Sequence, residues 1–151
     1  MKSKQKSLLA IGLLVLNTLL FKAESFCIER TLKEQFKISN VVFQGKAVGI
    51  KPLAGRNGYY ITTFEIEKAW KGIKNNSRID IVTFNFSDEG HSFEIGKTYL
   101  VLDSPEAAKS EKINGLVTMN CTHTGLIDSN HAQADVKQLG KPQLVIKKDI
   151  K

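Results

Sequence analysis

The feature that most constrains this chain is residues 59–70, where two kinds of side chain alternate. One alternate set can for the most part face a hydrophobic core, and it consists of Tyr60, Thr62, Phe64, Ile66, Lys68 and Trp70. The other set includes Glu65 and Glu67, which can face water. Because successive side chains of a strand point to opposite faces of a sheet, the pattern predicts a long, half-buried β-strand. Two glutamates at this spacing are typical of a solvated strand face, so we do not assign them to acid–base catalysis.

Four further segments have the β-branched and aromatic composition of strands, and they are residues 40–51, 78–86, 98–102 and 115–119. The first of these contains Gly45 and Gly49, and small residues inside a strand indicate a bend. Residues 52–58 are rich in turn formers and are predicted as the tip between the first two strands. Residues 105–114 are predicted as a polar excursion.

Short helices are predicted at both ends of this array of strands. Thr31 and Glu34 have the spacing of a capping box, which predicts a helix over residues 31–37. Ser129 can cap a second helix that ends before Gly140. Five strands in an antiparallel pattern with such helices predict a mainly β fold, a five-stranded Greek-key OB-fold barrel with short N- and C-terminal helices.

Residues 1–25 have the pattern of a secretory signal peptide. A basic start precedes an apolar run over residues 8–21, and small residues lead up to the expected cleavage after Ser25. The apolar run is shorter than the roughly 20 residues of a bilayer span, which disfavours an uncleaved membrane anchor. We therefore expect a secreted or periplasmic domain over residues 26–145, followed by a basic tail at 146–151, with no stable membrane span.

The charge of the exported part is mild and scattered. Without the four lysines and one glutamate of the leader, the net charge of +7 becomes +4. A nucleic-acid footprint needs basic residues clustered on one face with aromatics between them, and the lysines here are dispersed. We therefore predict no nucleic-acid partner.

The chain has two cysteines, Cys27 and Cys121, and both follow the predicted leader. In an oxidising compartment two cysteines usually form one disulfide, and a bridge closing a loop of this length would stabilise the fold by about 4–5 kcal/mol in the chain-entropy model. A pair of free buried thiols is the alternative.

Several short motifs occur in a fixed order along the chain. They are Phe36, residues 40–46 (NVVFQGK), 63–66 (TFEI), 70–72 (WKG), Phe93, 96–101 (GKTYLV), 120–124 (NCTHT) and 139–140 (LG). In this order, over roughly residues 27–141, the set resembles the netrin-like module of the tissue inhibitors of metalloproteinases (TIMPs), especially the single-domain bacterial forms. The resemblance implies an OB-fold barrel with an N-terminal segment disulfide-bonded onto it, secreted and non-enzymatic.

The resemblance also assigns roles to the two cysteines. In the inhibitors the chain begins Cys-x-Cys, and the amine and carbonyl of the first cysteine reach the catalytic zinc of the protease, which accepts a further ligand. Cys121 lies in the matching motif of the second bridge, so its implied partner Cys27 corresponds to the second cysteine. Ser25 then stands at the chelating position, and residues 89–93 contain no cysteine where the first bridge would end.

Other sites find little support in the sequence. His91, His123 and His131 could join Cys121 in a metal site, but the spacing lacks a second pair of ligands. There is no Gly-x-Ser-x-Gly elbow for a hydrolase. We therefore assign no catalytic residue, no metal ligand and no cofactor.

The leading hypothesis is a secreted, non-catalytic protein-binding module. Its candidate contact residues are Phe26, Cys27, Ile28, Gly90 and His91, with the tip at residues 52–58 beside them. The expected partner is an extracellular or envelope protein, with a zinc metalloproteinase as one candidate. The alternative is a metalloproteinase inhibitor acting through its N-terminal segment, and an enzyme with an unrecognised site ranks last.

Overall fold

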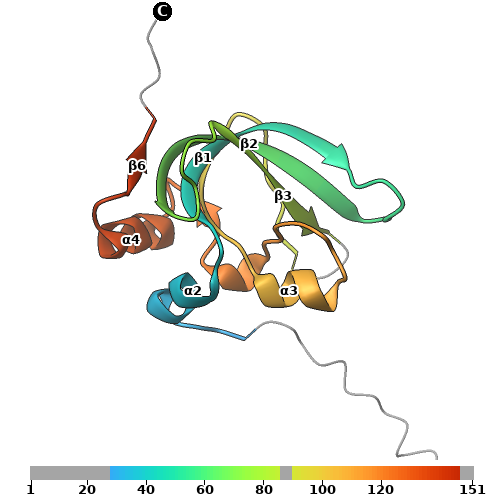
Figure 1. The fold of residues 1–151 in the computed structure, drawn as a ribbon, viewed down its shortest axis with the longest axis horizontal. Helices are drawn as coiled ribbons and strands as arrows, with labels where there is room; N and C mark the ends of the chain where they lie inside the picture. The colour runs from blue at the N-terminus through green and yellow to red at the C-terminus, as the bar shows by residue number, and fades with distance from the viewer. Residues whose placement is uncertain (1–27, 86–89, 147–151) are drawn as a thin grey trace, which may run out of the picture.

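A computed structural model of the chain describes residues 28–85 and 90–146 (Figure 1). The predicted leader, Phe26, Cys27 and all but the first residue of the predicted basic tail lie outside the described residues. Within the described ranges, none of the helices has both the length and the apolar character needed to cross a membrane.

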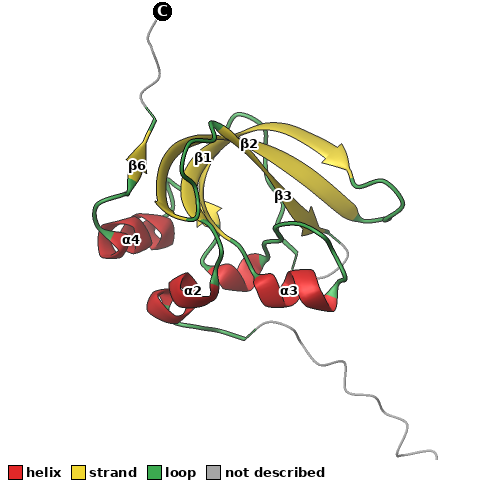
Figure 2. Cartoon of the chain, viewed as in Figure 1, coloured by secondary structure: helices red, strands yellow, loops and turns green. Residues whose placement is uncertain are grey.

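The described residues form a mainly β structure around one antiparallel sheet, as the sequence predicts (Figure 2). Its longer strands are β1 (Val42–Pro52), β2 (Tyr59–Lys71), β3 (Arg78–Phe84) and β4 (Thr98–Leu102), and two short strands are β5 (Gly125–Leu126) and β6 (Leu144–Val145). The order is β3-β2-β1-β4-β5, with β6 paired to β2. No strand pair among the described residues joins β3 to β5, so the sheet is not closed into a barrel.

One face of the sheet carries the main hydrophobic core. Phe64 lies at its centre, with its ring 5.5 Å from that of Phe43 and 4.9 Å from that of Phe93. The buried members of this cluster are Val41, Phe43, Ala47, Phe64, Ile66, Ala69, Ile73, Ile81, Phe93, Tyr99 and Val101. Each fully buried phenylalanine contributes roughly 1.5–3 kcal/mol of hydrophobic stabilisation.

Irregular pairing between β1 and β2 changes which residues of β2 face this core. Ile66 and Lys68 pair with successive residues of β1, as do Ala69 and Lys71, so Glu67 and Trp70 are extra residues in the ladder. An extra residue of this kind shifts the alternation of side chains from one face to the other. The expectation that alternation runs unbroken to Trp70 is therefore wrong, because Ala69 takes the place on the core face.

The opposite face of the sheet is covered by α2 (Leu32–Ile38) and α4 (Asn130–Leu139). Their apolar residues pack on Val42, Leu100 and Leu102, and the indole of Trp70 is buried among them. Its Nε1 donates a hydrogen bond to the Gly140 carbonyl at 2.8 Å, at the end of α4. Trp70 is thus a packed residue rather than an exposed binding aromatic.

Both predicted helices are confirmed, α2 with its capping box and α4 with Ser129 as its N-cap.

The segment after β4 differs from the prediction. Residues predicted as a polar excursion contain α3 (Pro105–Ser110), whose N-cap is Ser104. The predicted strand at 115–119 is wrong, because among the described residues it forms only a single parallel bridge, Val82 with Val117. Residues of this segment join a third buried cluster with β3 and α3, formed by Tyr59, Val82, Phe84, Ala107, Val117 and Met119.

A buried aspartate joins α2 to the sheet at the end of β4. The Asp103 carboxylate accepts hydrogen bonds from the Val41 amide at 2.8 Å and from the Asn40 side chain at 3.0 Å. The backbone carbonyl of Asp103 accepts a further hydrogen bond from the Ser39 hydroxyl at 2.7 Å. Burial raises the pKa of the Asp103 carboxyl, and these hydrogen bonds to the carboxylate oppose that shift. The carboxylate thereby fixes the chain where α2 ends and the sheet begins.

Gly72, which follows β2, should tolerate a side chain poorly, because both its backbone conformation and its surroundings oppose one. Its φ is +76°, and an added Cβ would lie 2.0 Å from the Asn40 carbonyl oxygen. Gly55 is a matched control, because its φ is +72° but its Cβ would meet nothing within 4 Å. We expect Gly55→Ala to cost about 1 kcal/mol and Gly72→Ala about 3 kcal/mol or more, measured as the free energy of unfolding in urea. Equal losses in the two variants would contradict the steric explanation.

Candidate functional site

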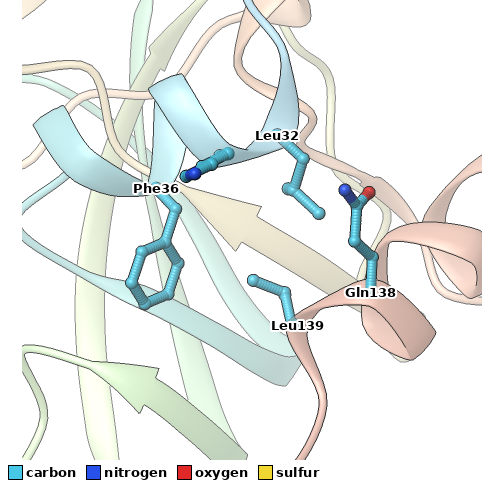
Figure 3. A pocket seen from close by; sticks show the side chains of 5 residues that line it. Leu32, Phe36, Gln138 and Leu139 are labelled. Carbon is cyan, nitrogen blue, oxygen red and sulfur yellow. The ribbon is translucent and has the colours of Figure 1, made fainter.

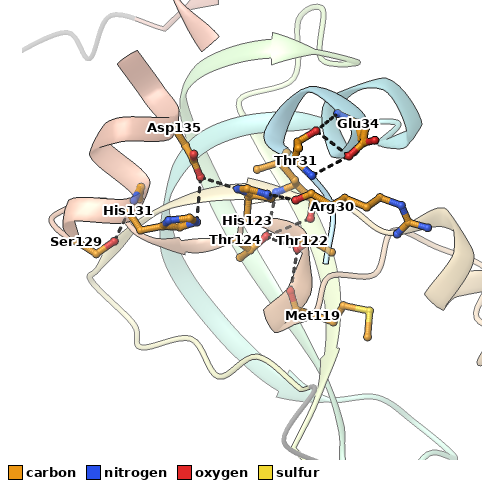
Figure 4. A network of polar contacts seen from close by, with 12 residues as sticks. Arg30, Thr31, Glu34, Met119, Thr122, His123, Thr124, Ser129, His131 and Asp135 are labelled. Atoms are coloured by element: carbon orange, nitrogen blue, oxygen red, sulfur yellow. Dashed lines mark hydrogen bonds and ion pairs between the residues drawn. The ribbon is translucent and has the colours of Figure 1, made fainter. Parts of the chain in front are cut away.

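Residues 28–30 lead into α2 and are held against the body of the protein by Arg30. The Arg30 carbonyl lies 2.7 Å from His123 Nε2 (Figure 4). The Arg30 guanidinium donates to the Glu106 carboxylate of α3 at 2.8 Å. Since Glu106 is largely exposed, this ion pair contributes at most about 1 kcal/mol. The N-terminal segment is thus fixed by one backbone and one side-chain contact to two separate elements.

The turn that carries His123 is built on three buried threonine hydroxyls. Thr118 Oγ1 donates to the Leu102 carbonyl at 2.7 Å and lies 2.9 Å from the hydroxyl of Thr122 and 2.7 Å from that of Thr124. The Leu102 amide in turn donates to Thr124 Oγ1 at 3.0 Å. The short 3-10 helix η2 (Asn120–Thr122) follows Thr118 and contains Thr122. His123 follows it with a φ of +63°, a left-handed conformation that the surrounding bonds hold in place.

His91 binds the other end of the same turn. Its Nδ1 lies 2.9 Å from Asn120 Oδ1, and its backbone N–H donates to the Thr83 hydroxyl at 3.1 Å. Its ring packs on Phe93 and Tyr99, with centroids 4.5 and 6.0 Å away. Burial lowers the pKa of the His91 imidazole, and the bond to Asn120 partly opposes this. The imidazole therefore supports the loop from inside.

The structure brings part of the predicted contact surface together. Ile28 is 57% exposed beside the anchored Arg30, and Gly90 is half-buried next to His91. The N-terminal segment and this loop meet at the turn that carries Asn120 and His123. Phe26 and Cys27, the remaining predicted contact residues, lie outside the described residues.

The same turn places Cys121 close to the N-terminal segment. Cys121 lines a cavity of about 300 Å³ together with Glu29, Arg30, His123 and His131. Its predicted partner Cys27 precedes Glu29 by two residues and lies outside the described part of the chain. The Cys27–Cys121 disulfide stays a prediction.

The predicted tip at residues 52–58 folds back onto α3. Arg56 donates to the Glu111 carbonyl at 2.7 Å, and its guanidinium lies 5.3 Å from the centre of the Tyr59 ring. Tyr59 Oη donates to the Glu111 carboxylate. Burial and this bond raise the pKa of the Tyr59 phenol. Because Arg30 binds the first turn of α3 and the tip binds its end, α3 joins the two predicted contact regions. Its sequence signal is Ser104-Pro105-Glu106, an N-cap followed by proline and an acidic first turn.

Two of the histidines weighed as metal ligands do come together, but with a carboxylate instead of Cys121. Asp135 Oδ2 lies 2.9 Å from His123 Nδ1 and 3.3 Å from His131 Nε2 (Figure 4). The two imidazole rings are stacked, with centroids 5.2 Å apart. Sequence reasoning missed Asp135, although His131 and Asp135 are four residues apart on α4 and therefore share a helix face.

A second hollow lies between α2 and α4. Leu32, Phe36, Gln138 and Leu139 point toward one another there around a cavity of about 270 Å³ (Figure 3). Leu32, Phe36 and Leu139 belong to the hydrophobic cluster between these helices and the sheet. The hollow is thus a gap in helix packing.

No known protein family model matches this chain, and no curated protein matches its sequence. The resemblance to the TIMP-like modules therefore rests on the residues quoted above.

The burial of His91 predicts a measurable pH dependence of stability. Its folded-state pKa lies below the ordinary value of 6.5, so on acidification the unfolded chain binds a proton that the native state excludes. The stabilisation is present above pH 6.5 and is lost as the pH falls from 6.5 through the native pKa. We expect His91→Gln to reduce this loss, by up to about 1.4 kcal/mol for each unit by which the two pKa values differ. Urea unfolding of both proteins between neutral pH and about pH 5 tests this. Parallel curves for the two proteins would contradict it.

Proposed function

We propose that this protein is a secreted, non-catalytic binding module of the netrin-like and TIMP-like class. It would contact an extracellular or envelope protein through residues 26–28 and the loop at Gly90 and His91. The observation that carries the proposal is the anchoring of the N-terminal segment. Arg30 is bound through its carbonyl and its guanidinium, while Ile28, two residues earlier, is 57% exposed.

A segment held in this way suits recognition. An apolar side chain that is exposed on a fixed backbone loses little conformational entropy when it is buried by a partner. The tip at residues 52–58 extends the same surface through α3, since Arg56 and Arg30 bind opposite ends of that helix. The contact surface is therefore proposed to run from Ile28 across α3 to the tip.

We propose further that the sheet is the main part of a five-stranded Greek-key barrel of the OB type. Strands β1, β2 and β3 form a meander, and β4 returns antiparallel to β1. The Val82 amide of β3 donates to the Leu116 carbonyl at 2.8 Å, and the Thr118 amide donates to the Val82 carbonyl at 3.0 Å. The Ser104 amide, which follows β4, donates to the Val117 carbonyl at 2.7 Å. Residues 116–118 thus lie between β3 and the end of β4, where the closing strand of such a barrel would run.

Two features support a non-catalytic role. The paired glutamates of β2 have separate structural partners, because Glu65 binds Arg78 at 2.7 Å and Glu67 accepts from Gln44 at 3.0 Å. The His91 ring is packed among aromatic side chains. These residues serve the fold in ways that do not need a substrate.

The binding surface is tested by a charge at Ile28. A partner is first identified by capture from the extracellular or envelope fraction, and its affinity for the purified protein is then measured directly. We expect Ile28→Asp to weaken binding at least about tenfold, because it places a carboxylate where the partner is proposed to bury an apolar side chain. Val145→Asp is the matched control, since Val145 is 56% exposed on β6 and should leave affinity unchanged. Equal affinities for Ile28→Asp and the unmodified protein would overturn the proposed surface, and turnover of a substrate panel would favour an enzyme instead.

The anchored segment also allows a narrower proposal, inhibition of a zinc metalloproteinase by a free terminal amine at Phe26. Such an amine could reach the open coordination position of a catalytic zinc only if the chain starts there. We expect one extra residue ahead of Phe26 to abolish inhibition while the unfolding temperature stays the same. Inhibition that survives the extra residue would exclude this mechanism, and the wider binding proposal would stand.

A further inference from the structure

We infer that His123, His131 and Asp135 form a binding site for a divalent transition metal ion of the zinc class. The nitrogen and oxygen donors of these three residues all lie within 4.8 Å of one another. The site adjoins the N-terminal segment through the bond between His123 and Arg30, but the inference does not rest on the proposed function.

The hydrogen bond to Arg30 determines which nitrogen of His123 is available. A backbone carbonyl only accepts, so His123 Nε2, 2.7 Å from the Arg30 oxygen, carries the hydrogen and donates it. In the neutral ring the lone pair is then on Nδ1, the nitrogen that lies 2.9 Å from Asp135 Oδ2. A bond from one ring nitrogen to a carbonyl is the arrangement that orients histidines which bind metals through the other.

This geometry places two acceptors face to face. An ionised carboxylate and the lone pair of a neutral imidazole repel each other at hydrogen-bond distance, unless a proton or a metal cation lies between them. Asp135 is buried, which makes an uncompensated negative charge there costly. The space between these two atoms therefore suits a proton or a metal cation, and the neighbouring His131 supplies a third ligand atom for a metal.

The spacing suits a small transition metal ion. With bonds of about 2.0–2.1 Å, the donors of a tetrahedral site lie roughly 3.3 Å apart. The two histidine-to-carboxylate distances, 2.9 and 3.3 Å, are already close to this value. His131 is the adjustable member, because its side chain is 68% exposed and can rotate to shorten the remaining distance. His123 is the fixed member, with its left-handed backbone.

The fourth position can open toward the cavity of about 300 Å³ that both histidines line. Glu29 lines the same cavity, so either its carboxylate or a water can complete the coordination. Two imidazoles with one carboxylate favour zinc, nickel or copper over magnesium and calcium, which prefer oxygen donors alone.

The test is zinc binding by the purified protein, prepared without a histidine tag, treated with a chelator and kept under non-reducing conditions. Isothermal titration should give one zinc ion per chain, and zinc should raise the unfolding temperature. Cobalt should give the absorption bands of a four-coordinate site. We expect His131→Gln to weaken zinc binding at least about tenfold, as loss of a ligand does. Because His131 is an exposed residue, this variant should fold normally.

Lys137→Gln is the matched control, since it changes an exposed residue of the same helix, α4, and leaves the three donors intact. It should bind zinc as the unmodified protein does. Asp135→Asn should lose binding, and Glu29→Gln should lose it only if Glu29 is the fourth ligand. Absence of stoichiometric zinc binding, or unchanged affinity in His131→Gln, would overturn the inference and leave a proton as the cation between His123 and Asp135.

Discussion

The site depends on the buried hydroxyl cluster of Thr118, Thr122 and Thr124. These side chains satisfy both the amide and the carbonyl of Leu102, where β4 ends. Buried backbone groups left without partners are costly, so the turn is held to the sheet by the need to pair them. Once the turn is fixed, the backbone places His123 where its side chain contacts both the Arg30 carbonyl and Asp135.

The site also depends on the sheet, whose strands present one apolar face to the main core and another to α2 and α4. The extra residues in β2 turn Ala69 toward the main core and leave Trp70 to pack beneath α4, where its indole N–H reaches the Gly140 carbonyl. This contact fixes the C-terminal end of α4, and Asp135 lies one turn before that end. The packing of Trp70 against the end of α4 thus helps to hold the helix that carries Asp135.

Local signals in the sequence were sufficient for elements that depend on local interactions. The capping box at Thr31 and the N-cap at Ser129 predict helices that form, and alternation locates β2. The predictions that failed concern residues whose interaction partners lie far away in the sequence. Residues 115–119 have strand composition, but their backbone hydrogen bonds go to Val82 of β3, to the Ser104 amide and to Thr122. The grouping of His123 with Asp135 needs both η2 and α4 in place, and only the His131–Asp135 spacing was visible beforehand.

The proposed attachment of the N-terminal segment and the proposed metal site share the imidazole of His123. His123 donates from Nε2 to the Arg30 carbonyl, and in the proposed metal site its Nδ1 would bind the ion together with Asp135. A positive charge on the Nδ1 side withdraws electron density from the ring and makes the Nε2 hydrogen a stronger donor, as charge-assisted hydrogen bonds are. Occupancy of the proposed metal site would therefore tighten the attachment of the N-terminal segment. By linkage, a partner that favours the attached segment would favour the bound metal to the same degree.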